Sequence, residues 1–232
     1  MSIGFRVYMK RVLPPKGLVD AFRALPASNV ADCMGRISAM SAEIRLMSKP
    51  FADSVAGAAL TVKARPGDNL MLHKALNMAG EGDFIVVSNG GDRSQSLMGE
   101  IMASYARSKN VAGIVIDGPI RDVGALRELD IPVYATGSTP GGPFRKGPGE
   151  VNVPVACGGI HVTPGDIILA DSDGVIVIPR NDAAALLEEA RKFSANDQAK
   201  LAAAKAGTQD RSFVDKILAE SGCEIIQSVY PG

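Results

Sequence analysis

The chain has 232 residues, of which 46% are hydrophobic, and it carries 25 basic and 25 acidic side chains. This length and apolar content are enough for one compact domain with a sizeable core. The formal net charge of zero excludes a global electrostatic field of the kind that draws nucleic acid or an anionic membrane to a protein. We therefore expect neither nucleic acid nor a membrane as a partner.

Two further features concern the compartment. No apolar run approaches the ~20 residues that a bilayer-spanning helix needs, and the first residues lack the apolar core of a secretory signal. The three cysteines, Cys33, Cys157 and Cys223, are widely spaced and form no Cys-x-x-Cys pair, which argues against disulfides or a zinc site. The sequence predicts a cytoplasmic protein with free thiols.

The first part of the chain alternates helical and strand patterns, bounded by Pro and Gly turns. Such alternation favours a sheet with helical crossovers. In chain order the expected elements are helices at 16–25 and 28–34, a strand at 57–64, a helix at 69–78, a strand at 84–87, a helix at 96–108, a strand at 111–116, a helix at 123–129 and a strand at 132–135.

The pattern changes after residue 136. Residues 137–150 hold five glycines and three prolines, which predicts a long loop of the kind that is usually functional or mobile. Within it, we interpret Arg145 and Lys146 as solvated surface charge. Short strand patterns without intervening helices then predict antiparallel or barrel-like pairing, and two helical patterns end the chain. These strands are expected at 151–156, 160–162, 167–170 and 175–178, and the helices at 181–207 and 212–221.

Together these patterns predict an α/β protein with a mixed β-sheet or barrel-like core flanked by helices. We expect one core domain over residues 1–180, with the helices of 16–34 as an outer layer. Residues 181–232 are expected to form a helical extension that packs on a neighbouring subunit.

Two strand-to-helix junctions carry the candidate chemistry, because open α/β sheets place ligands at such junctions. Twenty residues separate Glu100, in the stretch Gly99-Glu100-Ile101-Met102, from Arg121 and Asp122. If a helix starts near Gly99, its unpaired N–H groups favour a carboxylate; if it starts at Arg93, they are already paired and the anion site fails. Arg121 could pair bidentately with that carboxylate, and Asp122 could hold a hard cation such as Mg²⁺ or Mn²⁺.

Simpler readings of the same residues remain open. Asp122 could cap a helix that begins at Val123, while Arg121 pairs with a surface acid. The two histidines, His73 and His161, are interpreted as structural side chains with satisfied hydrogen bonds.

The stretch from Pro66 to Pro179 resembles the RraA-like family, which includes the divalent-metal-dependent 4-hydroxy-4-methyl-2-oxoglutarate aldolases. No single motif is strong, but their order and spacing together are. The matching features are Pro66-Gly67-Asp68-Asn69 with His73, the Gly99-Glu100 step, Arg121-Asp122, Gly158-Gly159, Thr163-Pro164-Gly165-Asp166 and Asp171-Ser172-Asp173-Gly174-Val175.

The resemblance implies a β/β/α swivelling core, a homotrimer or homohexamer, and a lyase that forms a pyruvate enolate from a 4-hydroxy-2-oxo acid, with oxaloacetate decarboxylation as a side activity. It implies that the backbone of Gly99, Glu100, Ile101 and Met102 binds the pyruvate moiety and that Arg121 binds its carboxylate or keto oxygen. Asp122 is then the metal ligand, and Glu100 acts through a metal-bound water. An acid on the C-terminal helix of the neighbouring subunit also reaches such sites, for which Asp197 is the candidate here.

Two rival functions accompany this resemblance. Some relatives regulate an RNA-processing endonuclease, so the chain could be a non-catalytic binding protein; the presence of Glu100, Arg121 and Asp122 argues against that. A methyltransferase would need a Gly-x-Gly loop running from the first strand into a helix, for which Asn89-Gly90-Gly91-Asp92 is a poor substitute.

Overall fold

The computed structural model describes residues 3–51 and 53–230. The chain divides into two compact units, Met1–Phe193 and Ser194–Gly232. Helix α6 (Ala183–Lys205) begins in the first unit and continues in the second, which also holds α7 (Ser212–Glu220), a helix without a buried residue. No helix in the described part of the chain combines the length and the apolar character needed to cross a membrane.

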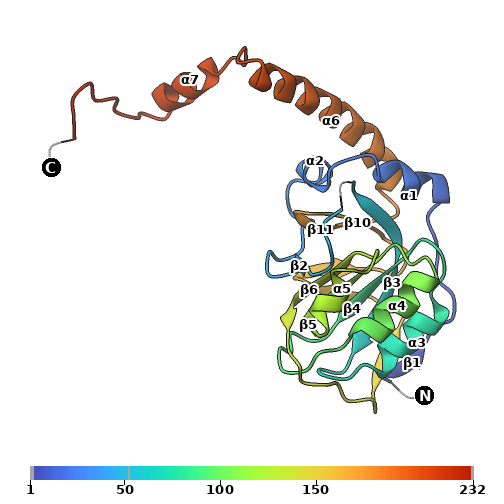
Figure 1. Ribbon diagram of the computed structural model, residues 1–232. Coiled ribbons are helices and arrows are strands. Elements are labelled where there is room, and N and C mark those ends of the chain that lie inside the picture. The colour runs from blue at the N-terminus through green and yellow to red at the C-terminus, as the bar shows by residue number, and fades with distance from the viewer. Residues whose placement is uncertain (1–2, 52, 231–232) are drawn as a thin grey trace. The chain divides into compact units, whose positions relative to one another are not determined.

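The first unit is built on a mixed nine-stranded sheet (Figure 1). Its strand order is β1-β7-β3-β4-β5-β6-β2, and β10 joins it by pairing with both β3 and β11. Strands β3 to β6 run parallel, whereas β7 and β10 pair antiparallel with β3. The predicted mixed α/β fold is therefore confirmed, with an open sheet in place of a closed barrel. The strands are β1 (Phe5–Val7), β2 (Arg45–Leu46), β3 (Val55–Ala64), β4 (Asp83–Ser88), β5 (Gly113–Ile120), β6 (Val133–Ser138), β7 (Gly149–Val151), β10 (Ile167–Asp171) and β11 (Gly174–Ile178), with β8 (Val155–Cys157) and β9 (Ile160–Val162) in a separate hairpin.

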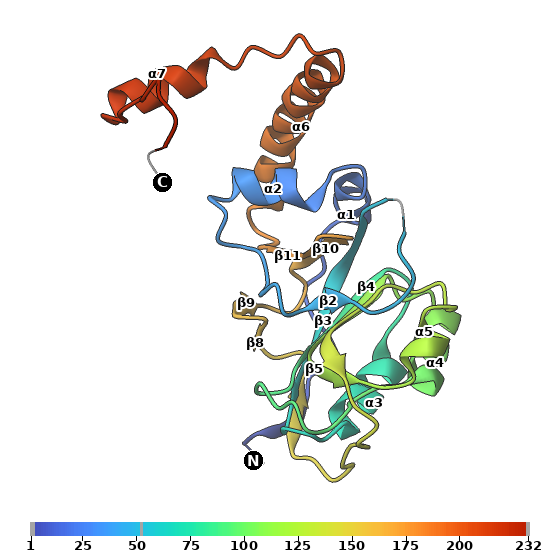
Figure 2. The same ribbon diagram turned by 60° about the vertical axis from the view of Figure 1, so that its left-hand side comes forward.

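Three helices follow the parallel strands and lie on the same side of the sheet (Figure 2). They are α3 (Leu70–Met78), α4 (Glu100–Ser108) and α5 (Val123–Leu126). Because successive strand residues point to opposite faces, Ile85 and Val87 pack beneath these helices while Phe84 and Val86 pack in a cluster on the other face. Both faces are thus buried, as the continuous apolar strand patterns required.

A third apolar cluster joins β10 and β11 to α1 (Lys16–Phe22), α2 (Ala27–Cys33) and the first turns of α6. Helices α1 and α2 therefore pack on the antiparallel part of the sheet. The parallel part of the sheet, with its strand-to-helix junctions, is covered by α3, α4 and α5.

Several predicted elements have different bounds in the structure, and three of these differences concern the site or the sheet. The helix expected from residue 96 begins only at Glu100, because the backbone of Gly99 is extended, with φ −143° and ψ −164°. Ser96 and Leu97, which precede it, donate their N–H groups to the carbonyls of Gly141 and Pro119. The single strand expected at 151–156 is split into β7 and β8 by Asn152, whose φ of 57° is left-handed. The helix expected at 123–129 shortens to α5.

Candidate active site

Helix α4 begins at the carboxyl end of the parallel strands. Gly99 is its extended N-cap residue, with φ −143° and ψ −164°, and the first helical bond runs from Ala103 N–H to the Gly99 carbonyl at 3.1 Å. The N–H groups of the first turn, at Glu100, Ile101 and Met102, therefore have no acceptor within the helix. The helix therefore starts near Gly99 and not at Arg93, which is the start that an anion site requires.

The side chain of Asp122 turns to this helix N-terminus. Its Oδ2 accepts a hydrogen bond from the Glu100 N–H at 3.1 Å. The backbone of Asp122 is left-handed, with φ 57° and ψ 35°, and its side chain makes no capping bond to α5. Asp tolerates this region better than most residues, because its short polar side chain can bond locally. Asp122 thus occupies the N-cap position of the helix at Val123, as one reading of the sequence had it, but its side chain does not cap that helix.

Arg121 is positioned by its backbone and lies beside Asp122. It follows β5 directly, and its N–H donates to the Met98 carbonyl at 2.9 Å. Its Nε lies 3.5 Å from Asp122 Oδ2, with 41% and 42% of the two side chains exposed. A pair so open to water stabilises the fold little, and both groups stay accessible to a ligand.

The junction between β5 and α4 requires glycine at position 99, because there is no room for a side chain. A Cβ there would collide with the Asp122 carboxylate and come within 3.0 Å of Arg121 Cγ. The backbone angles of Gly99 are ordinary, so the requirement for glycine comes from the approach of Arg121 and Asp122. Only glycine lets those two side chains reach the first turn of α4.

A small cavity of about 70 Å³ opens at this point. It brings together the backbone of Gly99 with Ile101, Met102, Arg121 and Asp122 from the predicted set. The Glu100 side chain is exposed and is not among the lining residues, although its N–H is bonded to Asp122. The remaining lining residues are Asn69, His73, Ser96, Leu97, Met98, Pro143 and Arg145.

None of these remaining lining residues was predicted as a site residue, and three of them, Asn69, His73 and Arg145, bear on the chemistry of the site. The Asn69 Oδ1 and His73 Nε2 atoms are buried without a hydrogen-bond partner in the described part of the chain, which contradicts the interpretation of His73 as a satisfied structural residue. Burial, and secondarily the positive charge of Arg145, lower the pKa of His73. Arg145 is exposed, as the interpretation of it as solvated charge expected, and it also lines the cavity. The proximity of Asn69 and His73 to the loop was not visible in the sequence, which offered only their place in a family motif.

The donor set limits which metal could bind. Among residues 3–51 and 53–230, no group of three or more His, Cys, Asp and Glu side chains is placed to hold a metal ion. A single carboxylate at a small cavity fits Mg²⁺ or Mn²⁺, which keep several waters and take the remaining oxygens from substrate. It does not fit a closed zinc site. Asp197 belongs to α6 in the second unit, and its assignment to a site stays a prediction.

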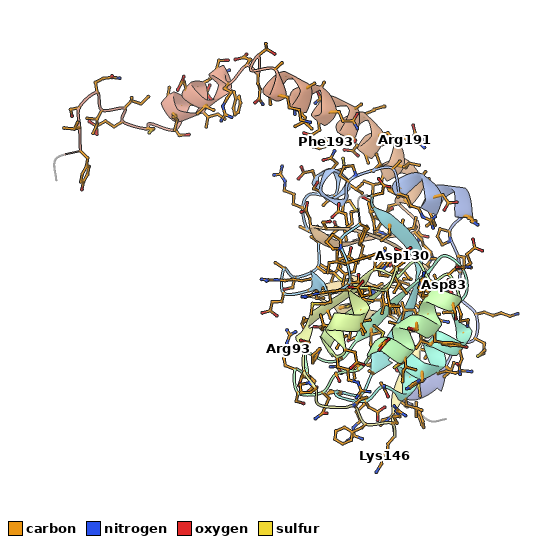
Figure 3. All side chains as sticks on the ribbon, in the orientation of Figure 1. Asp83, Arg93, Asp130, Lys146, Arg191 and Phe193 are labelled. Carbon is orange, nitrogen blue, oxygen red and sulfur yellow. The ribbon has the colours of Figure 1, made fainter. Side chains whose placement is uncertain are left out.

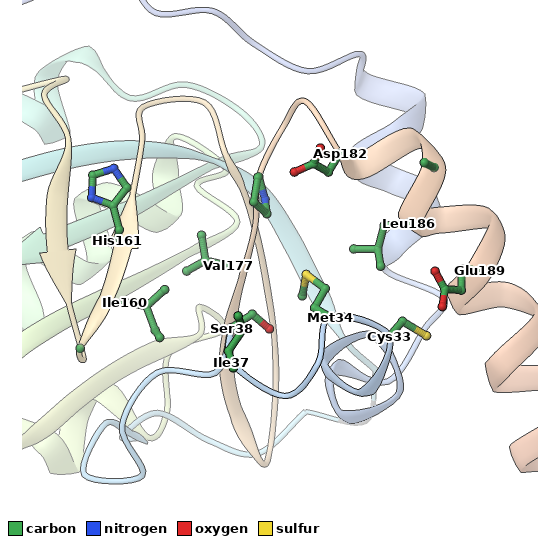
Figure 4. Close-up of a pocket in the computed structure, with 13 residues that line it drawn as sticks. Cys33, Met34, Ile37, Ser38, Ile160, His161, Val177, Asp182, Leu186 and Glu189 are labelled. Atoms are coloured by element: carbon green, nitrogen blue, oxygen red, sulfur yellow. The ribbon is translucent and has the colours of Figure 1, made fainter.

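A larger cavity of about 670 Å³ lies elsewhere in the first unit, between α2, the β8–β9 hairpin and the first turns of α6 (Figure 4). Its walls are mostly apolar, with His161, Asp182 and Glu189 as ionisable side chains. The Cys33 thiol there is made less reactive, because burial and the nearby carboxylates of Glu189 and Asp32 raise its pKa. The smaller cavity, with its arginines and helix N-terminus, is the better candidate for chemistry on an anion.

Known proteins are similar to this chain in sequence and in structure. The model of the RraA-like family, described as Aldolase/RraA, matches residues 27–177. A relative in Halalkalibacterium halodurans, named "Putative 4-hydroxy-4-methyl-2-oxoglutarate aldolase", is 35% identical over 78% of this chain and 86% of its own length. A relative of the same name in Ectopseudomonas mendocina is 38% identical over 55% of this chain and 78% of its own.

A solved structure is also similar. It is titled the RNA-processing inhibitor RraA from Thermus thermophilis, and it superposes with a TM-score of 0.61 at 31% identity. The match covers 66% of this chain and 92% of that one.

Proposed function

The chain belongs to the RraA-like family, and from that premise we propose that it is a divalent-metal-dependent aldolase that cleaves a 4-hydroxy-2-oxo acid such as 4-hydroxy-4-methyl-2-oxoglutarate. The observation that carries the proposal is the meeting of Arg121 and Asp122 at the open N-terminus of α4, in one small cavity. An arginine and a helix N-terminus together suit the carboxylate and keto oxygens of a 2-oxo acid.

Substrate binding follows from these groups. The guanidinium of Arg121 pairs with the carboxylate or the keto oxygen of the pyruvyl end, and the first-turn N–H groups of α4 donate to the same end. For the Glu100 N–H to join them, Asp122 must give up its bond to that group. The substrate thus frees the Asp122 carboxylate for the cation.

The reaction needs charge stabilisation at one place. As the bond between C3 and C4 breaks, its electron pair moves to C3 and forms the pyruvate enolate, while the C4 hydroxyl loses its proton and becomes a carbonyl. Arg121 and the positive end of α4 lie where the enolate charge develops. We assign the hydroxyl proton to a water held by Glu100, and protonation of C3 then releases pyruvate.

The cation is part of the proposal. Asp122 would hold the cation directly. Glu100 of the same subunit and Asp197 of a neighbouring subunit would each act through a water molecule. A bound Mg²⁺ or Mn²⁺ supplies Lewis-acid stabilisation of the developing charge. Oxaloacetate gives the same enolate when it loses carbon dioxide, so decarboxylation is expected as a side activity. A trimer or hexamer would supply the neighbouring Asp197, which light scattering can test.

The decisive experiment measures pyruvate release. Purified protein is given racemic 4-hydroxy-4-methyl-2-oxoglutarate, and separately oxaloacetate, with Mg²⁺ or Mn²⁺ and again with excess chelator. We expect turnover that the chelator abolishes and added metal restores. Absence of metal-dependent turnover on both substrates would reject the aldolase.

The second candidate is a non-catalytic regulator of an RNA-processing enzyme. It is supported by the similarity to the solved RNA-processing inhibitor. A regulator does not need Arg121 and Asp122 beside an open helix N-terminus, so catalysis is the stronger proposal. Inhibition of an RNA-processing endonuclease by this protein, in the absence of lyase turnover, would favour the regulator.

A further inference from the structure

The larger cavity of the first unit is separate from the candidate active site. Its volume is about 670 Å³, and in the described part of the chain it shares no lining residue with the small cavity at the start of α4. Apolar side chains form most of its walls, among them Met34, Val177 and Leu186 (Figure 4). A concave apolar site of this size, with a few polar groups, is the usual form of a small-molecule site.

Ser38 places an unsatisfied hydroxyl at this cavity. The residue is 8% exposed, and its side chain is part of the lining, with Oγ on the side of Met34 (Figure 4). Oγ is buried and has no hydrogen-bond partner among the described residues, although the Ser38 carbonyl accepts from the Val177 N–H at 3.1 Å. A buried hydroxyl without a partner is costly, so one in the wall of a cavity indicates a ligand that supplies the partner.

The charged side chains at this cavity give it a negative potential. Asp182 and Glu189 line it from α6, and neither forms a salt bridge within residues 3–51 and 53–230. No lysine or arginine of the described chain lines it. The Cys33 thiol in the same wall responds to this potential, because burial and then the carboxylates of Glu189 and Asp32 raise its pKa. Asp32 pairs with Arg36 at 2.7 Å, so Asp182 and Glu189 are the acids left to attract a cation.

The size of the cavity favours a small molecule over a protein. It is lined by 13 residues, whereas a stable protein interface takes roughly 20–30 residues from each side. A sphere of its volume is roughly 11 Å across, which is close to the Debye length at ordinary ionic strength, so a cation anywhere inside is attracted by both carboxylates. An ammonium group only donates hydrogen bonds, and Ser38 Oγ can accept one.

We propose that this cavity is a second binding site, which takes a small apolar molecule that carries a protonated amine. The apolar body of the ligand packs against the apolar walls, and its ammonium group donates to Ser38 Oγ in the field of Asp182 and Glu189. The site is independent of the aldolase proposal, because it uses none of the described residues that line the small cavity.

The test uses three naphthyl probes, whose fluorescence can be followed because the chain contains no tryptophan. They are the cationic naphthylethylamine, the uncharged naphthylethanol and the anionic naphthylacetate. Fluorescence titration of the full chain should give the lowest Kd for the amine, about 5-fold below that of the alcohol, which is the preference that two exposed carboxylates can supply. The acetate should bind most weakly, because the same carboxylates repel it.

Two acids at adjacent positions of α6 give a matched pair of variants. Glu189→Gln should reduce the preference for the amine over the alcohol by ~3-fold. Glu188→Gln should leave it unchanged, because Glu188 does not line the cavity and pairs at 3.2 Å with Arg191, which projects outward from α6 (Figure 3). Ser38→Ala should weaken amine binding by ~10-fold without lowering the melting temperature, since it removes an unpaired buried group.

The outcomes separate this site from its alternatives. The proposal stands if the amine binds best and if Glu189→Gln and Ser38→Ala, but not Glu188→Gln, weaken its binding. It is overturned if no probe binds, if amine and alcohol bind equally, or if the two glutamine variants behave alike. The competing occupant is α7 of a second copy, whose Phe213 and Ile217 are exposed at helical spacing. Amine binding that appears only in Phe213→Ser/Ile217→Ser would mean that α7 fills the cavity, which also overturns the proposal.

Discussion

The Asp122 carboxylate accepts a hydrogen bond from the Glu100 backbone N–H at 3.1 Å, across the gap between the end of β5 and the start of α4. A left-handed backbone at Asp122 and a missing side chain at Gly99 both serve this contact. Strained backbone is often kept at functional sites. The contact also occupies an N–H group that a substrate carboxylate would use, so the site holds its own acid where the ligand is proposed to bind.

Replacing the Asp122 carboxylate tests its proposed role. Asp122→Asn keeps an oxygen that can accept from Glu100, so the free energy of unfolding should change by about 1 kcal/mol or less. Loss of the charge should lower kcat for pyruvate release by ~100-fold or more, the usual range for one electrostatic group at a reacting centre. The matched control is Asp130→Asn, whose exposed carboxylate pairs with Lys49 at 3.2 Å and should leave kcat unchanged. Equal activity of wild type and Asp122→Asn would remove Asp122 from the mechanism.

The glycine at the start of α4 should be needed for activity more than for stability. In Gly99→Ala the new methyl group collides with Asp122 and crowds Arg121. Both side chains are half exposed and can move, so we expect a stability loss of about 1 kcal/mol, at the low end for overpacking. Displacement of the two groups should cost ~100-fold in kcat/KM. Steady-state kinetics and denaturant unfolding measure the two effects.

Gly124→Ala is the control for this change. Gly124 lies in the neighbouring helix α5 with no atom within 4 Å of an added Cβ. We expect a small gain in stability, up to about 1 kcal/mol, and unchanged kinetics. If the two alanine variants behaved alike, the steric account of Gly99 would be wrong.

The buried Asp68 carboxylate should hold the loop of Arg145 in place. It accepts from three backbone N–H groups, including that of Leu70 at 2.9 Å. Asp68→Ala leaves these donors unpaired, so the free energy of unfolding should fall by at least about 2 kcal/mol. Amide hydrogen exchange at Lys146 and Gly147 should speed up in this variant. Unchanged protection at both amides would show that other contacts anchor the loop.

His73 predicts a specific pH dependence of stability. Burial, and then Arg145, lower its pKa below the ordinary value of about 6.5. Between the two pKa values the unfolded chain binds a proton that the folded chain does not, so stability is full above about pH 6.5 and falls as the pH drops toward the folded pKa. The free energy of unfolding should therefore rise between pH 5 and 7, and rise less steeply in His73→Asn.

The same shift can be read by NMR. The ring resonance that disappears in His73→Asn identifies His73, and its titration midpoint should lie below about 6.5. In Arg145→Met the midpoint should move upward, because one of the two causes of the shift is gone. If the midpoint did not move in Arg145→Met, the Arg145 guanidinium would lie too far from the His73 ring to affect its pKa.

Much of the fold could be predicted because it depends on local pattern. Apolar runs such as Ile85–Val87 between glycine-containing turns specify buried parallel strands, whichever side chains lie across the sheet. The start of α4 could not be predicted in this way. Residues 96–98 are compatible with a helix, but the extended backbone of Gly99 separates them from α4, and Ser96 and Leu97 bond to Gly141 and Pro119 across the fold.

The sequence by itself determined the family, the mixed sheet and the candidates Arg121 and Asp122, because these rest on residue type and on spacing along the chain. The tertiary structure decided where the side chains meet: Asp122 turned to α4 and not along α5, and Asn69, His73 and Arg145 at one cavity. The physical reason is that hydrogen bonds across long sequence separations, such as those of Asp68 to Lys146 and Gly147, depend on the packing of the whole sheet. No local pattern in the sequence predicts these long-range hydrogen bonds.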